Sequence, residues 1–448
     1  MKSNVFPALV VLATACGFAA CGGSTAGNAP APSPDAGDTT ADGGAIVIDA
    51  APEADPPPLD HGKPTTTYPA FKVEGAQLVD NSGDRLKTPT IVTVTWDTDP
   101  DQAKLEAFDD AIGGTDYWKA VTAEYGVAPA ISGMTNHVRI PVTAASPLPV
   151  SLSQQDLDTL VATKAGASMT SGWPVPTSNH VYILYLHPNT ILDFGGGASA
   201  CTVGVGGYHD STMINGADIS YAIVPRCSFH MLTAFDATTI SASHELAEAA
   251  TDPRPGNGIY GFDDNHFALE QWQRGNVEDG DACEFFKDSE YKEVDPFPYF
   301  VQRQWSNVAS AAGHDPCVPS VGPYFNVTPL TLETVYADLS KNGGSAKAAS
   351  KGIAIRVGET KTFPVGFFSD APTNGPWTVS AVEQGNPAYP VKTPHLKVSI
   401  DKTSGENGEI AYVTVTVNSA GATKTEYISV VSTLNGIKRY MPILIGSM

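Results

Sequence analysis

Residues 241–253, Ser-Ala-Ser-His-Glu-Leu-Ala-Glu-Ala-Ala-Thr-Asp-Pro, say most about the fold of this 448-residue chain. Alanine, leucine and glutamate favour a helix, and Asp252-Pro253 ends it, because a residue before proline disfavours helical geometry. His244 and Glu248 are separated by one helical turn and lie on one face, where they could bind one metal ion together. Glu245 lies about 100° further round the helix.

The pattern His244-Glu245-x-x-Glu248 matches the His-Glu-x-x-His helix of zinc metalloproteases, with the second histidine replaced by glutamate. In that arrangement Glu245 is the general base, which deprotonates a water molecule polarised by the ion. A carboxylate ligand makes the ion a weaker Lewis acid, so we expect Zn²⁺, with Mn²⁺ or Ca²⁺ as competitors. The alternative is a solvated helix face, because Glu and Ala are good helix formers.

A catalytic zinc site needs a third protein ligand and one open position. The best source is the segment at residues 277–283, Val-Glu-Asp-Gly-Asp-Ala-Cys. Glu278 is the first choice for the third ligand and Asp281 the second. Three further residues remain as alternatives: Asp252, His209 and His266.

The N-terminus is typical of an exported protein. Lys2 precedes an apolar stretch at residues 5–15, which is too short to span a bilayer. Residues 18–24, Phe-Ala-Ala-Cys-Gly-Gly-Ser, resemble a bacterial lipoprotein cleavage site with Cys21 as the lipidated residue. Lipidation at Cys16 and an ordinary signal peptide are the alternatives. We therefore expect an outer-membrane or cell-surface lipoprotein, or otherwise a secreted protein, with the lipid as its only membrane anchor.

Charge and cysteine content agree with export. The formal net charge is −22, which argues against nucleic acid and anionic membranes as partners. The four cysteines beyond the signal are even in number, which suggests disulfides in an oxidising compartment. Their order suggests the pairs Cys201–Cys227 and Cys283–Cys317, although three pairings are possible.

The composition divides the chain into four regions. Residues 1–20 form the signal peptide, and residues 21–64 form a disordered tether rich in Pro, Ala and Asp. Residues 65–320 mix strand and helix patterns, and residues 323–448 show only short alternating runs, as in an immunoglobulin-like β-sandwich.

Several elements can be placed within these regions. Apolar, β-branched runs predict strands at residues 90–96, 181–186, 220–224, 396–400, 413–417 and 427–431. Capping residues and periodicity predict helices after Asp99, around residues 117–125, after Ser153 and over about residues 239–250.

The motifs of the mixed region occur in a recognisable order: Tyr117-Trp118, Glu124-Tyr125-Gly126-Val127, Gly207-Tyr208-His209, Ser243-His244-Glu245-Leu246-Ala247-Glu248, Thr251-Asp252-Pro253, Glu278-x-Gly280-Asp281-x-Cys283 and Trp305-Ser306-Asn307. This order is similar to the exordium, or phosphate-induced protein, family of plants and its bacterial and fungal relatives. The resemblance covers about residues 85–320. It implies a zincin-like metalloprotease in the microbial branch, whereas many plant members lack the His-Glu pair and act as secreted growth-related proteins.

Together these patterns predict an α+β protein with a zincin-like metalloprotease domain followed by a C-terminal immunoglobulin-like β-sandwich. The expected function is zinc-dependent cleavage of a peptide or protein substrate at the cell surface. Two alternatives remain open. One is a non-catalytic exordium-like surface protein that binds cell-wall polymer or a protein partner, and the other is a calcium-stabilised structural domain.

Overall fold

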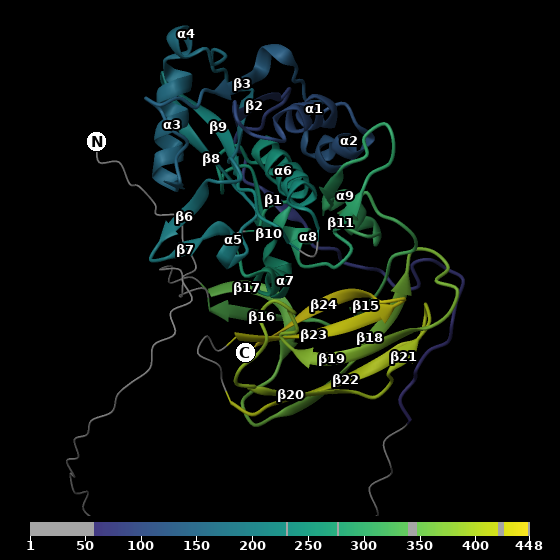
Figure 1. The fold of residues 1–448 in the computed structure, drawn as a ribbon. Helices are drawn as coiled ribbons and strands as arrows, with labels where there is room; N and C mark the ends of the chain where they lie inside the picture. Colours follow the sequence, from purple (N-terminus) through teal and green to yellow (C-terminus); the bar gives the residue numbers. More distant parts are fainter. Residues whose placement is uncertain (1–57, 230–231, 276, 339–346, 420–424, 447–448) are drawn as a thin grey trace, which may run out of the picture. The chain divides into compact units, whose positions relative to one another are not determined.

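The computed structural model describes residues 58–448, apart from residues 230–231, 276, 339–346, 420–424 and 447–448 (Figure 1). Leu59–Met448 belong to one unit. The predicted signal peptide, the candidate lipidation residues Cys16 and Cys21 and most of the predicted tether lie outside the described residues. Among the helices that the structure describes, none has the length and apolar character needed to cross a membrane.

A five-stranded sheet carries the elements around the predicted metal-binding helix (Figure 1). Its strands lie in the order β3 (His137–Ile140), β2 (Thr90–Trp96), β5 (His180–Tyr185), β9 (Ala217–Val224) and β8 (Tyr208–Ile214). The first four strands are parallel, and β8 pairs antiparallel with β9 at one edge. The predicted strands at residues 90–96, 181–186 and 220–224 therefore lie side by side at the centre of this sheet.

Helices cover both faces of this sheet, as the uninterrupted apolar run of β5 requires. On one face, Val181, Ile183 and Tyr185 pack into a core with α1 (Gln102–Ile112), α2 (Asp116–Thr122) and α6 (Ala234–Thr251). On the other face, Tyr182 and Leu184 pack with α3 (Gln154–Gly166), whose N-terminus is capped by Ser153 as predicted. Successive strand residues point to opposite faces, so one strand serves both cores.

Helix α6 carries the His-Glu-x-x-Glu pattern and is longer than predicted. It begins at Ala234, because the Thr233 side chain accepts a hydrogen bond from the backbone N–H of Asp236 and caps the helix. It ends at Thr251, with Asp252 as its C-cap, as the Asp-Pro pair predicts. The helix lies between β9 and β12 (Phe300–Gln302), and most of its residues are buried. The interpretation of this pattern as a solvated helix face is therefore wrong.

Short elements complete the region around the sheet. The small strands pair as β1 (Leu78–Asp80) with β10 (Ile259–Phe262), β4 (Ser151–Ser153) with β6 (Ile191–Gly195) and β7 (Ala198–Ser199), β11 (Glu290–Lys292) with β12, and β13 (Gln304–Trp305) with β14 (Cys317–Val318). The short helices are η1 (Ala123–Tyr125), η2 (Met134–Asn136), α4 (Ser168–Ser171), α5 (Ala200–Val203), η3 (Asp264–His266), α7 (Phe267–Gln273), α8 (Asp281–Glu284) and α9 (Asn307–Ala312).

The C-terminal region consists of two sheets in the residues that the structure describes. One has the order β15 (Phe325–Pro329), β18 (Thr360–Ser369), β22 (Ile410–Val417) and β20 (Leu396–Ile400). The other has the order β16 (Glu333–Asp338), β17 (Lys347–Ala354), β24 (Ile437–Gly446), β23 (Thr425–Leu434), β19 (Trp377–Glu383) and β21 (Ser404–Gly405). Alternate residues of β22, such as Val413 and Val415, enter a hydrophobic core that both sheets share. The prediction of a mixed α+β fold is confirmed.

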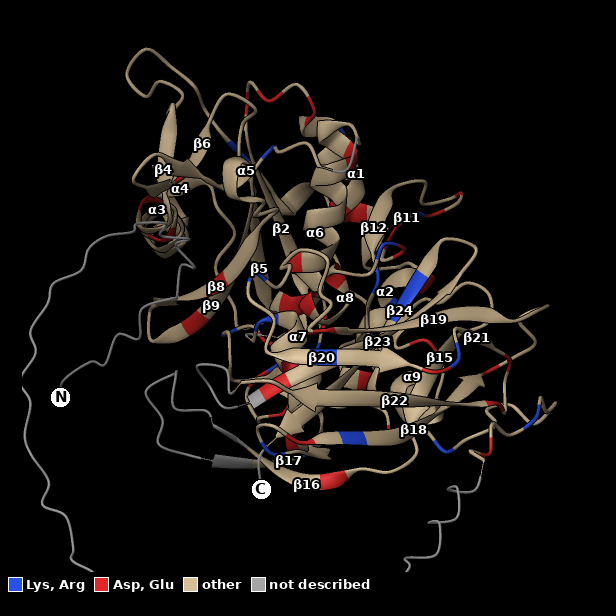
Figure 2. Cartoon of the chain, turned by 90° about the horizontal axis from the view of Figure 1, so that it is seen from below, with Lys and Arg blue, Asp and Glu red and all other residues tan. Residues whose placement is uncertain are grey.

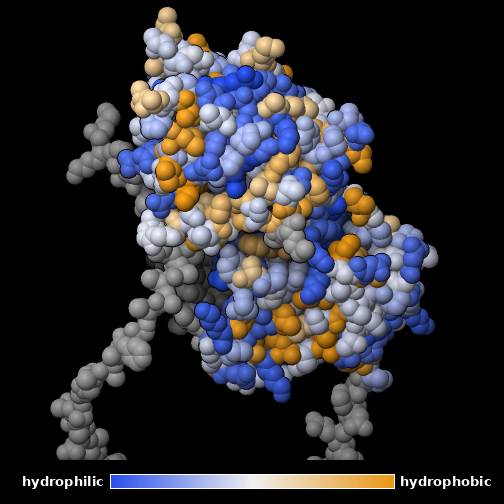
Figure 3. All heavy atoms as spheres, in the orientation of Figure 1, coloured by the Kyte–Doolittle hydropathy of each residue, from blue (hydrophilic) through white to orange (hydrophobic). Residues whose placement is uncertain are grey.

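The two-sheet region packs against the region of the five-stranded sheet. Trp272 in α7 stacks on Phe286 and contacts Tyr440 of β24. Arg439 binds Asp288 and Asp315 through its guanidinium group. On the face shown in Figure 3, apolar residues form small groups within a largely hydrophilic surface, as on many folded proteins.

Candidate metal centre

Helix α6 brings three of the predicted site residues, His244, Glu245 and Glu248, close together. His244 Nε2 lies 3.0 Å from Glu248 Oε1, the contact expected of residues one turn apart. Glu245 and Glu248 are only 5% and 2% exposed. Several acidic segments lie around α8, near α6 (Figure 2).

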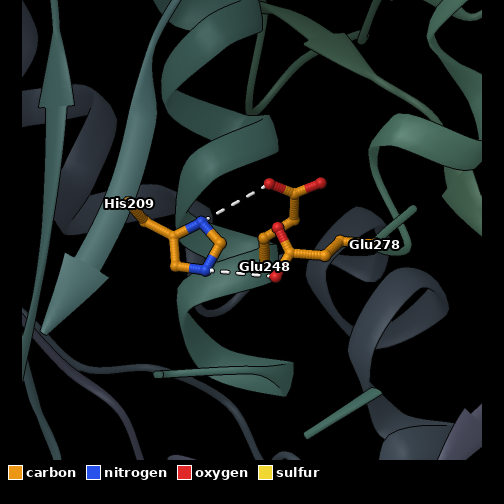
Figure 4. Close-up of side chains that lie close together, drawn as sticks. All are labelled: His209, Glu248 and Glu278. Carbon is orange, nitrogen blue, oxygen red and sulfur yellow. Dashed lines mark ion pairs between the residues drawn. The ribbon is translucent and has the colours of Figure 1, made fainter. Parts of the chain in front are cut away.

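The edge strand β8 contributes His209, which faces α6. Its Nδ1 atom lies 3.5 Å from Glu245 Oε2 and 3.5 Å from Glu248 Oε2. Its Nε2 atom lies 3.5 Å from Glu278 Oε1, so the imidazole is placed between Glu248 and Glu278 (Figure 4). His209 was one of three alternatives for the third ligand, and the structure brings it into the site.

The segment at residues 277–284 packs against α6 and forms another side of the site. Asp281 Oδ1 lies 3.7 Å from His244 Nε2, and the Asp281 backbone N–H donates to Glu248 Oε1 at 3.1 Å. The Cys283–Cys317 disulfide fixes the end of this segment, and the Trp305 backbone N–H donates to the Asp279 carbonyl oxygen. The predicted disulfides Cys201–Cys227 and Cys283–Cys317 are both confirmed.

Hydrogen bonds define which nitrogen of each histidine faces the carboxylates. Gln302 Nε2 donates to the Gly280 carbonyl oxygen, so its Oε1 faces His244 Nδ1 and accepts a hydrogen bond from the Nδ1–H group at 3.1 Å. His209 Nε2 likewise donates to the Asp252 carbonyl oxygen at 3.1 Å. Both tautomers follow from this hydrogen-bond network. In each neutral ring, the unprotonated nitrogen is therefore the one that faces Glu248, which is the arrangement that metal ligation needs.

Two glycines allow the backbone to approach these side chains closely. A Cβ atom at Gly280 would lie 2.7 Å from Glu248 Oε1 and 2.8 Å from His244 Nδ1. A Cβ atom at Gly207 would lie 2.6 Å from Glu245 Oε1. Any larger residue at either position would displace a site residue.

The site holds more negative charge than its histidines can balance. Burial raises the pKa of Glu278 and of Asp281 well above the usual range, and Glu248 adds to the effect at both carboxyl groups. Burial would lower the pKa of His244, but Glu248 raises it well above its usual value. Burial would also raise the pKa of Glu248, but the neighbouring His244 and His209 hold it well below its usual value. A cation would relieve the repulsion among these carboxylates.

The donor atoms fit a divalent metal ion. With bonds of 2.0–2.2 Å, two ligands of one ion are expected to be about 3.0–3.6 Å apart. The His244–Glu248 and His209–Glu248 separations of 3.0 and 3.5 Å fall in this range. Two sets of residues could each hold an ion: His209, Glu248 and Glu278, and His244, Glu245 and Glu248. Moreover, Glu278 Oε1 is buried and has no hydrogen-bond partner among the described residues.

Two of the alternative ligands lie outside this arrangement. The carboxylate of Asp252 accepts hydrogen bonds from the backbone N–H groups of Gly256 and Gly258, and only its backbone carbonyl meets His209. His266 bonds to Asp263 and to the Glu74 carbonyl oxygen, and it lines a separate cavity of 470 Å³. None of the residues with donor atoms in the metal centre lines that cavity, which lies between α7 and β24.

Comparisons with known proteins leave the family of this chain open. No protein-family model matches it, and no curated protein matches it. Among solved structures, the chain is similar to the crystal structure of the titin M3 domain, with 13% identity over 20% of this chain and 81% of that chain. The TM-score of 0.14 is too low to carry an argument about fold or function.

Proposed function

We propose that this protein is a metal-dependent hydrolase that cleaves peptide bonds. The observation that supports this best is the convergence of two imidazoles and three further carboxylates around Glu248, each imidazole with the nitrogen that can bind a metal toward that residue. The arrangement has an open side, because the Asp281 side chain is 33% exposed and that of His244 is 13% exposed. We infer that a substrate carbonyl would approach the centre from that side.

The residues divide into ligands and a base. We infer that His244, Glu248 and Asp281 hold the ion, since Asp281 rather than Glu278 lies beside His244 Nε2. A divalent ion bound there would polarise the substrate carbonyl and make water more acidic. Glu245 is the general base, and burial raises the pKa of its carboxyl group toward the range in which a base works at neutral pH.

The ligand types favour zinc over calcium. Calcium prefers six to eight oxygen ligands, whereas the two imidazoles here offer nitrogen, which suits Zn²⁺. Mn²⁺ is the closest competitor, because carboxylates also suit it.

The wider architecture is consistent with this function. We infer that the five-stranded sheet with α6 is a zincin-like domain and that the two C-terminal sheets are an immunoglobulin-like sandwich. Both disulfides fit an oxidising compartment, so we also propose that the protein is exported and held at the cell surface by a lipid on Cys21. Its substrate is a peptide or protein.

The test separates metal binding from catalysis. Glu245→Gln should retain the bound metal, measured by elemental analysis, and should lose at least about 100-fold in the rate of peptide hydrolysis, measured with a peptide library. Glu333→Gln, at an exposed position of β16, is the matched control and should leave both unchanged. Full activity in Glu245→Gln would show that the assigned mechanism is wrong. Stoichiometric metal without hydrolysis by the unaltered protein would favour a non-catalytic binding protein.

A further inference from the structure

We infer that the centre holds two divalent cations, with the second bound by His209 and Glu278 and with Glu248 shared between the two. This inference rests on the proposed metal site, since Glu248 is also a ligand of the ion held by His244. The two oxygens of Glu248 point to different histidines: Oε1 toward His244 and Oε2 toward His209. A carboxylate in this position can bridge two ions.

His209 supplies the first argument for the second cation. Because its Nε2 donates to the Asp252 carbonyl oxygen, the Nδ1 lone pair faces the Oε2 atoms of Glu245 and Glu248, each at 3.5 Å. In the neutral ring this lone pair can bind a cation that lies between it and the two carboxylates. Both distances exceed an N–H···O hydrogen bond of about 2.7–3.2 Å and agree better with ligands that share an ion.

Glu278 supplies the second argument. It is 8% exposed, and its Oε1 atom has no hydrogen-bond partner in the described part of the chain. A buried carboxylate oxygen without a partner is costly, and coordination to a cation removes the cost. Glu278 Oε1 lies 3.5 Å from His209 Nε2, and one donor atom each of His209, Glu248 and Glu278 lie within 4.8 Å of one another, so the three side chains can share a cation (Figure 4).

Charge supplies the third argument. Glu245, Glu248, Glu278 and Asp281 carry four negative charges when ionised, whereas one divalent ion supplies two positive charges. The three glutamates are at most 8% exposed, so solvent cannot screen the remaining charge well. Two divalent cations would neutralise the four carboxylates and leave both histidines neutral and free to bind metal.

The class of ion follows from the ligands. The second position offers one imidazole and carboxylate oxygens, which suits Zn²⁺ or Mn²⁺. In two-metal hydrolases the ions are about 3.5–4 Å apart, a spacing that one bridging carboxylate can span. Glu245 lies near both halves of the centre: its Oε2 atom is 3.5 Å from His209 Nδ1, and one of its oxygens is within 4.8 Å of donor atoms of His244 and Glu248.

The experiment is a count of bound ions on the full exported chain. Protein saturated with Zn²⁺ and dialysed should contain two ions per chain by elemental analysis. His209→Ala and Glu278→Gln should each reduce the count to one. His266→Ala, a histidine outside the centre, should leave it at two. Thermal unfolding of each variant, followed by circular dichroism, identifies a variant that fails to fold, and Glu278→Gln provides the milder of the two changes.

A second readout does not depend on activity. With Mn²⁺ in place of Zn²⁺, two neighbouring ions should give a spin-coupled electron paramagnetic resonance spectrum, which His209→Ala should convert to that of an isolated ion. One ion per chain at saturation, or no ion, overturns the inference. Two ions in a protein without peptide hydrolysis would support this inference and remove the proposed peptidase function, whereas hydrolysis with a single ion would do the reverse.

Discussion

Gln302 Oε1 lies 3.1 Å from His244 Nδ1, and this hydrogen bond directs the other nitrogen of His244 toward Glu248 and Asp281. The amide cannot turn over freely, because Gln302 Nε2 donates to the Gly280 carbonyl oxygen at 2.8 Å. In the proposed centre Gln302 is therefore a positioning residue: it selects the tautomer of His244 and is not itself one of the inferred ligands. Partners of this kind are worth about 10–100-fold in metal affinity.

Gln302→Leu should weaken zinc binding by about 10–100-fold, because the His244 ring loses its orientation and its preferred tautomer. Competition with a chromophoric chelator measures the affinity. The control is Gln304→Leu, another buried glutamine on the next short strand, whose side-chain amide donates to the Ser243 carbonyl oxygen rather than to a histidine. Equal zinc affinities for the two variants would contradict the positioning role.

Substitutions at Gly280 and Gly207 should affect two properties separately: the affinity for metal and the action of the general base. Gly280→Ala places a methyl group against Glu248 and His244 and should reduce zinc affinity by about tenfold or more. Gly207→Ala meets Glu245 instead and should reduce the hydrolysis rate while zinc binding is largely retained. Gly166→Ala, where the new methyl group meets its nearest neighbour at 3.8 Å, is the control and should change neither. Zinc affinity that falls only in Gly207→Ala would contradict the assignment.

Local sequence patterns predict the helices and strands of the fold more completely than they predict the residues of the site. The run of β-branched residues predicts the bounds of β2 as the structure has them, and the same holds for β20. The start of α6 was placed too late, because Thr233 as a cap carries less signal than the apolar pattern that follows it. Strand order within the sheet depends on contacts between segments far apart in the chain, which no local pattern contains.

The site was predictable where its residues share one element or carry chemistry of their own. His244, Glu245 and Glu248 follow from helical spacing, and Asp281 from its position in an acidic segment. His209 could be named only as an alternative, because the register of β8 against α6 decides which way it points. Gln302 belongs to the motif Val301-Gln302-x-x-Trp305, but no role could be assigned to it from the sequence, since an amide gains its role here from its hydrogen bond with His244.

The two disulfides should differ in their effect on the metal centre. Replacing both Cys283 and Cys317 with serine frees the segment that carries Glu278 and Asp281 and should weaken zinc binding. Replacing Cys201 and Cys227 should cost about the same stability, roughly 3–4 kcal/mol in either case, because the closed loops have similar lengths of 34 and 26 residues. Chemical denaturation and zinc titration check the two effects. Equal losses of zinc affinity would show that the Cys283–Cys317 bond does not hold the ligands in place.

A buried acid that is not part of the metal centre should govern part of the pH dependence of stability. Asp109 in α1 is 1% exposed, and its carboxyl group accepts hydrogen bonds from Thr93 and Tyr185. Burial raises the pKa of Asp109 from its ordinary value of 3.8 to about 7, against the opposing effect of these two hydrogen bonds. The folded state therefore holds this proton over a pH range in which the unfolded chain has already lost it.

The sign of the pH effect follows from this difference in proton binding. The contribution of Asp109 to stability is present below about pH 4 and is lost as the pH rises to about 7, by an amount on the order of 4 kcal/mol. Asp109→Asn removes the titration, so its stability relative to wild type should increase between pH 5 and about pH 8 when measured by urea unfolding. Asp116→Asn, an exposed change at the start of α2, is the control and should show no such trend. A constant difference between Asp109→Asn and wild type across this range would mean that Asp109 titrates near its ordinary pKa in the folded protein.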